Sequence, residues 1–226
     1  MDMDITVPDE VPVMTLPQVV FFPQSLLPLH IFEPRYRQML SDVLGSDRLF
    51  AVAKLASGSA AAPGAFEPPH RIASIGIVRA CQENTDGTSN LLLQGLCRVE
   101  VRAIVDEHPY RRIRIRALSS APPADPAANI RRRDVVARLI ALKQKFGVLP
   151  GELAEFLKTV DDPETFIDLA AFTVCDSPDL KQRMLETLDV GARLDLLRRR
   201  LRREVQLLRL QHRLQGELSD DQIETN

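Results

Sequence analysis

The hydrophobic period of the chain changes near residue 126, and this change limits the possible folds more than any other feature of the sequence. Before residues 119–126, short apolar runs and alternating patterns are typical of β-strands. After them, apolar residues recur with the spacing of amphipathic helices. Pro122, Pro123 and Pro126 separate the two patterns. We therefore expect an α+β protein with a β-domain at residues 10–120 and a helical domain at residues 126–215.

Short runs in the first half predict β-strands at residues 19–22, 49–55, 75–81, 90–96 and 112–117. The turn signal Asp86-Gly87 predicts that the third and fourth of these form a hairpin. An apolar stripe of helical spacing predicts one helix at residues 34–44. Residues 57–69 are rich in alanine, glycine and proline, and we expect an exposed loop there. Many short strands with one inserted helix favour a small barrel that is closed or nearly closed.

The second half predicts helices at residues 127–146, 150–159 and 191–215, and further helix starts at Asp162-Pro163 and Ser177-Pro178. The last helix has two apolar stripes. One stripe is typical of a core face. The opposite stripe is either covered by other elements of the chain or exposed for a second copy or a partner. Its residues are Leu196, Leu207, Leu210 and Leu214.

Charge is segregated along the chain, although the net charge is only -2. Residues 97–133 carry nine arginines and four acids, and residues 191–214 carry eight arginines and two acids. Residues 151–189 carry ten acids and three bases. Such segments either neutralise each other in the folded chain or present local basic faces.

The sequence contains none of the common catalytic or nucleotide-binding motifs, so we expect no enzyme, no catalytic residue and no cofactor. The four histidines stand apart from one another, and we expect no metal site. Three cysteines without a CxxC pair favour a reducing compartment. No apolar stretch is long enough for a membrane span, and residues 1–10 do not resemble a secretory signal. We therefore expect a cytoplasmic protein that does not act at a membrane.

Several motifs together resemble the Lon protease N-terminal domain family. The opening motif is the most specific, and it consists of Leu16-Pro17, residues 19–23 and residues 27–37. A second match covers residues 75–78, Asp86-Gly87 and residues 91–101, with Gly76, Gly95 and Arg98 at positions where the family pattern has glycine and arginine. Residues 179–186, 189–190 and 193–194 match the helical part more loosely.

The resemblance implies a PUA-like β-barrel followed by an α-helical bundle. In full-length Lon this region precedes an ATPase and a protease, and it contributes to substrate recognition and assembly. Neither catalytic part is recognisable in this chain, which therefore looks like a free-standing substrate-binding module. An ATP-dependent protease is a possible partner of such a module, and the oligomeric state stays open.

Three functions follow as hypotheses. The first is a non-catalytic binder of unfolded or exposed polypeptide segments, for which the opening motif supplies the candidate residues Phe22, Pro28, His30, Phe32 and Tyr36. The second is an RNA binder that uses Arg112, Arg114 and Arg116 as a phosphate track, although few aromatic residues are present to stack on bases. The third is an adaptor or assembly protein whose partner binds Leu207, Leu210 and Leu214.

Overall fold

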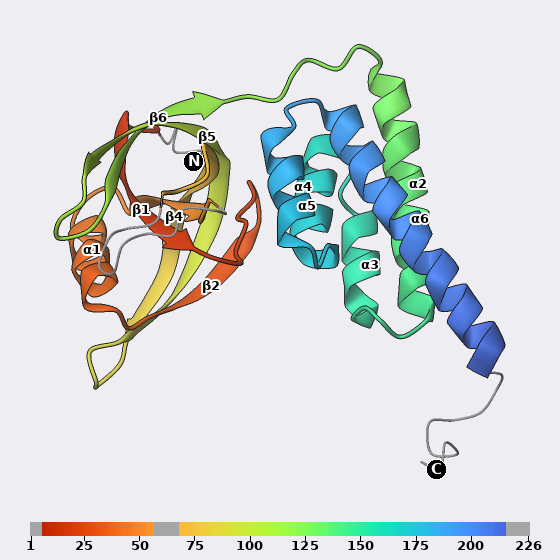
Figure 1. Cartoon of the computed structure of the whole chain (residues 1–226), viewed down its shortest axis with the longest axis horizontal. Helices are drawn as coiled ribbons and strands as arrows, with labels where there is room; N and C mark the ends of the chain where they lie inside the picture. Colours follow the sequence, from red (N-terminus) through yellow and green to blue (C-terminus); the bar gives the residue numbers. More distant parts are fainter. Residues whose placement is uncertain (1–5, 57–67, 216–226) are drawn as a thin grey trace. The chain divides into compact units, whose positions relative to one another are not determined.

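The structure is a computed structural model that describes residues 6–56 and 68–215. Most of the loop expected at residues 57–69 lies outside the described residues. The elements follow one another in the order β1 (Glu10–Leu16), β2 (Leu26–Ile31), α1 (Pro34–Leu44), β3 (Leu49–Lys54), β4 (Ile72–Glu83), β5 (Ser89–Asp106), β6 (Arg112–Leu118), α2 (Pro126–Lys145), α3 (Gly151–Lys158), α4 (Pro163–Val174), α5 (Pro178–Glu186) and α6 (Val190–Gln215) (Figure 1).

The chain divides into two compact units. The first comprises the residues up to Ala121 together with Asp168–Leu188, and the second comprises Pro122–Ile167 and the residues from Asp189 onward. The second half of α4 and all of α5 therefore belong with the sheet. The division expected from the sequence groups all helices after residue 126 together, and it stays a prediction about independently folding domains.

The sheet of the first unit has the strand order β2-β5-β4-β3-β1-β6, and β5 also pairs with β6. Strand β5 reaches both β2 and β6, because its first part pairs with β2 and its second part pairs with β6. The pairings from β1 through β3, β4, β5 and β6 lead back to β1, where a ladder of three residue pairs joins β1 and β6. The α+β class expected from the sequence is confirmed. The paired strands form a barrel-like ring, which is completed only by the short ladder between β1 and β6.

Two apolar clusters form the core of the first unit. In one, the predicted stripe of α1 packs on side chains from five strands, including Leu27, Phe50 and Leu93. In the other, β1, β3, β4, β5 and β6 bury small and β-branched side chains such as Ala51 and Ile113. Along β3, Leu49, Ala51 and Ala53 of this cluster alternate with Phe50 and Val52 of the first cluster, so both faces of this strand are buried.

The prediction of a strand at residues 19–22 is wrong. This segment is buried but irregular, and the first strand is β1, which precedes it. The segment meets its backbone requirements differently, because hydroxyl groups of Ser74 and Ser25 donate to the carbonyl oxygens of Phe21 and Phe22 at 2.7 and 2.6 Å. Buried apolar runs therefore do not distinguish a strand from an irregular segment with side-chain hydrogen bonds.

The helices of the second unit begin where the sequence predicts them. Asp125 accepts a hydrogen bond from the Ala128 amide at the start of α2, and Asp162 accepts one from the Thr165 amide at the start of α4. Helices α2 and α6 pack along each other (Figure 1). The core stripe expected on α6 comprises Leu194, Leu197, Leu201, Val205 and Leu208. The first four are buried and Leu208 is partly exposed, which confirms the stripe along most of its length.

The segregated charges pair within each unit. In the second unit, the fully buried Arg193 contacts Glu164 at 3.2 Å, and Lys143 contacts Glu204 at 2.9 Å. The acidic segment and the arginine-rich segments therefore neutralise each other in part.

Candidate functional site

Residues 17–25, which contain the first part of the opening motif, form an irregular segment that fixes the start of β2. Gly95 of β5 lies directly against this segment: the Gln24 amide donates to the Gly95 carbonyl, and the Gly95 amide donates to the Ser25 carbonyl, both at 2.9 Å. A Cβ atom at position 95 would lie 2.1 Å from the carbonyl oxygen of Phe22. Only glycine permits this close approach of two backbones.

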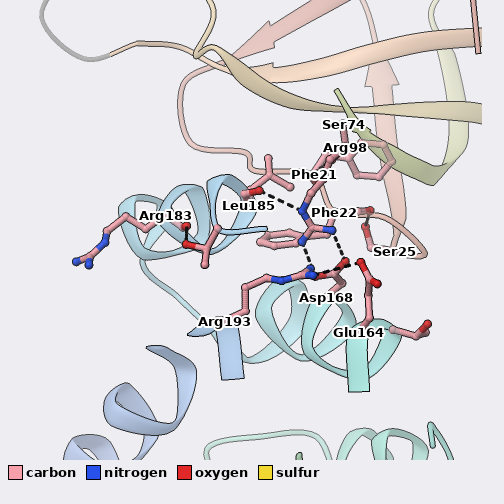
Figure 2. A network of polar contacts seen from close by, with 12 residues as sticks. Phe21, Phe22, Ser25, Ser74, Arg98, Glu164, Asp168, Arg183, Leu185 and Arg193 are labelled. Atoms are coloured by element: carbon pink, nitrogen blue, oxygen red, sulfur yellow. Dashed lines mark hydrogen bonds and ion pairs between the residues drawn. The ribbon is translucent and has the colours of Figure 1, made fainter. Parts of the chain in front are cut away.

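A buried ion pair joins β5 to α4 within the first unit. Arg98 donates two hydrogen bonds to the carboxylate of Asp168, at 2.6 and 2.7 Å, and a third to the carbonyl of Leu185 at 3.1 Å (Figure 2). Both charged side chains are almost completely buried. The bidentate pair holds the second half of α4 against the sheet, and the bond to the Leu185 carbonyl holds the end of α5 there.

Strand β2 is an edge strand, because it has β5 as its one neighbour among the described strands. Leu27 and Ile31 point into the core, whereas Leu26, Pro28 and His30 are exposed on the opposite face. Phe32 continues this exposed row beyond the end of the strand. Leu26 is 50% exposed and Phe32 is 61% exposed. We call Leu26, Pro28, His30 and Phe32 the β2 face.

The β2 face is ordered by contacts with β5. The His30 Nδ1 atom lies 2.8 Å from the Oδ1 atom of Asn90, and the rings of His30 and Phe32 stack with centroids 6.1 Å apart. Strand pairing places Pro28 opposite Leu92. The face is therefore an apolar surface with a polar edge, held in place by the sheet.

The candidate residues for polypeptide binding separate into two groups. Pro28, His30 and Phe32 lie together on the β2 face. Phe22 is 0% exposed, and Tyr36 is buried with its hydroxyl next to Thr15, so these two are core residues that support the surface. Leu26 was not among the candidates, although a two-residue period back from His30 and Pro28 reaches it.

Two of the candidate arginines for RNA binding are engaged by carboxylates. Arg114 contacts Glu10 at 2.6 Å, and Arg116 contacts Glu100 at 2.8 Å. Glu100 also accepts hydrogen bonds from Arg71 and Arg102, and chiefly the bond from Arg71 holds its pKa below the usual range. Arg112 lies beside the hydroxyl of Tyr110. This surface is a network of ion pairs, so it supports the RNA hypothesis less than a row of unpaired cations would.

The second apolar stripe of α6 is largely exposed. Leu207, Leu210 and Leu214 are 60%, 52% and 86% exposed. This exposure keeps the hypothesis of a partner-binding face open.

We expect Leu207→Glu combined with Leu210→Glu to leave the free energy of unfolding within about 0.5 kcal/mol of the parent chain, because exposed side chains contribute little to stability. Urea denaturation measures this change, and light scattering on the same samples measures the oligomeric mass. A loss of folding would mean that the stripe is covered. A lower mass without unfolding would identify it as an interface.

No helix within residues 6–56 and 68–215 has the length and hydropathy needed to cross a membrane. In the same residues, histidine, cysteine and acidic side chains form no cluster of three or more that could hold a metal ion.

The first unit is a mixed sheet with α1, the second half of α4 and α5 grouped with it, and strand β2 at its edge carries an exposed apolar row. The sequence profile described as the ATP-dependent protease La (LON) substrate-binding domain matches residues 10–203. The chain belongs to this family.

Curated relatives are similar along nearly the whole chain. Lon protease from Desulfosudis oleivorans is 26% identical over 217 residues, which cover 95% of this chain and 26% of the relative. Lon protease 2 from Myxococcus xanthus is 27% identical over 226 residues, which cover 96% of this chain and 27% of the relative. The chain spans about a quarter of the length of these relatives.

Solved structures share the fold. The N-terminal domain of Mycobacterium avium complex Lon protease has a TM-score of 0.64 at 15% identity, covering 83% of this chain and 95% of that chain. The Lon N-terminal domain protein from Xanthomonas campestris has a TM-score of 0.58 at 18% identity, covering 83% of this chain and 96% of that chain.

Proposed function

We propose that this chain is a non-catalytic module that binds unfolded or exposed polypeptide segments through the β2 face. The observation that carries the proposal is the row of Leu26, Pro28, His30 and Phe32, which exposes apolar surface on a strand whose other side is core. The family to which the chain belongs is a substrate-binding domain, which supports a binding role. Since the relatives are named Lon protease, we further propose that bound polypeptide is delivered to an ATP-dependent protease.

Polypeptide would bind to the side chains of the β2 face rather than extend the sheet. An added strand needs a continuous row of backbone donors and acceptors along the sheet edge. Pro28, in the middle of β2, has no amide hydrogen to contribute. The apolar side chains that alternate along β2 instead offer contacts for apolar side chains of an unfolded segment.

We expect Leu26→Ser combined with Phe32→Ser to weaken polypeptide binding about tenfold or more, because each lost side chain removes roughly 1 kcal/mol of burial. The measurement is a fluorescence titration of a labelled unfolded polypeptide at physiological salt, with unlabelled RNA as competitor. Both replaced residues are exposed, so the variant should fold as the parent does.

Leu207→Ser combined with Leu210→Ser is the matched control, since it removes two leucines of similar exposure from α6. The control should bind as the parent does. Equal affinity of the β2-face variant and the parent would contradict the proposal. Displacement of the polypeptide by RNA would favour the RNA hypothesis instead.

A further inference from the structure

A groove of about 630 Å³ lies along helix α2 in the second unit, and the proposed function does not use it. Asp134, Ala137, Ala141 and Lys145 line it at intervals of three and four residues, so they share one face of the helix. Lys158, at the end of α3, lines it as well. The groove therefore extends along about three turns of α2, or roughly 16 Å.

The floor of the groove is apolar and shallow. Ala137, Ala141 and Leu142 are all partly exposed there. Two alanines four residues apart leave a depression between larger side chains, into which the ridge of a second helix can pack. The floor thus fits the apolar side of a helical segment.

The rim of the groove is basic. Of its charged side chains, Arg133, Arg138, Lys145 and Lys158 are cations and Asp134 is the one acid. Arg133 is engaged by the Val160 carbonyl and Asp134, and Lys158 by Glu155. In the part of the chain that the structure describes, Arg138 and Lys145 have no such partner, and both are exposed.

We propose that this groove binds an acidic amphipathic segment of another polypeptide. Apolar residues on one side of the segment would cover Ala137, Ala141 and Leu142, and its carboxylates would meet Arg138 and Lys145. A nucleic acid fits less well, because no aromatic side chain lines the groove for base stacking. The site selects ligands by charge, and it lies in a different unit from the β2 face.

Fluorescence anisotropy tests the proposal with a labelled amphipathic peptide of about four helical turns that carries leucines on one side and glutamates on the other. The control peptide has lysine at every glutamate position. We expect the acidic peptide to bind the full chain, more weakly as salt is raised, and the basic peptide to bind at least about tenfold less well.

Arg138→Glu combined with Lys145→Glu reverses the two available cations, and we expect it to weaken binding of the acidic peptide about tenfold or more. The matched control is Arg202→Glu combined with Arg209→Glu on α6, which reverses two exposed arginines at the same seven-residue spacing outside the groove. This control should retain most of the affinity.

Several results would overturn the proposal. The first is equal binding of the acidic and basic peptides to the parent chain. The second is an equal loss of affinity for the acidic peptide in the groove variant and in the α6 control. The third is displacement of the acidic peptide by an RNA oligonucleotide whose own binding also requires Arg138 and Lys145. The comparison of the two peptides on the parent chain needs no variant, so it holds whether or not a substitution disturbs folding.

Discussion

Replacing Asp168 with alanine is expected to lower the free energy of unfolding by about 3–5 kcal/mol. The carboxylate accepts two hydrogen bonds from Arg98, and both groups are almost completely buried. The substitution leaves the buried guanidinium of Arg98 without this counter-charge, and the low dielectric makes that state costly. Urea denaturation followed by circular dichroism measures the change.

The double variant Arg98→Met with Asp168→Leu serves as the control, because replacing both partners of a buried pair with apolar residues costs far less than removing one. We expect it to recover most of the lost stability. A cost below about 1 kcal/mol for Asp168→Ala would contradict this account, since exposed ion pairs typically contribute that little.

Replacing Gly95 with alanine is expected to destabilise the chain by about 3 kcal/mol and also to weaken polypeptide binding. The added Cβ atom would lie 2.1 Å from the Phe22 carbonyl oxygen, and backbone cannot move aside as a flexible side chain can. The segment before β2 would have to shift, and the start of the β2 face would shift with it. Urea denaturation and the polypeptide titration measure the two effects.

Gly45→Ala is the matched control in the same unit. Gly45 has a right-handed helical backbone conformation, and its added Cβ atom would lie 3.6 Å from the nearest atoms, an ordinary contact distance. We expect the free energy of unfolding of the Gly45→Ala variant to stay within about 1 kcal/mol of that of the parent chain. Similar losses at both positions would mean that the close approach at Gly95 is not the cause.

Elements with a clear period or end signal could be predicted from the sequence. Helix α1 occupies the predicted residues, and the hairpin of β4 and β5 turns at Asp86-Gly87, where Gly87 has a φ of 76°. Strand β1 was missed because Pro12 interrupts its apolar residues. The proline is tolerated because it lies opposite Arg112, where the ladder between β1 and β6 ends. Residues 19–22 were misassigned because their hydrogen-bond partners, such as Ser74, lie far away in the sequence.

The candidate site was predictable only in part. The opening motif identified the right stretch of chain, but it did not separate the exposed Pro28, His30 and Phe32 from the buried Phe22 and Tyr36. Burial depends on which elements pack together, and a local sequence pattern does not reveal that packing. For the same reason the partner of Arg98 could not be assigned, since Asp168 lies 70 residues away.

The location of bound polypeptide tests the central claim most directly. A photoreactive phenylalanine analogue is placed at Phe32 in one sample and at Leu207 in another, two positions of similar exposure. Each sample is irradiated with a labelled unfolded polypeptide at increasing concentrations. We expect saturable crosslinking at position 32 and only weak, unsaturated crosslinking at position 207. Saturable crosslinking at position 207 with none at position 32 would contradict the assignment of the β2 face as the polypeptide-binding surface.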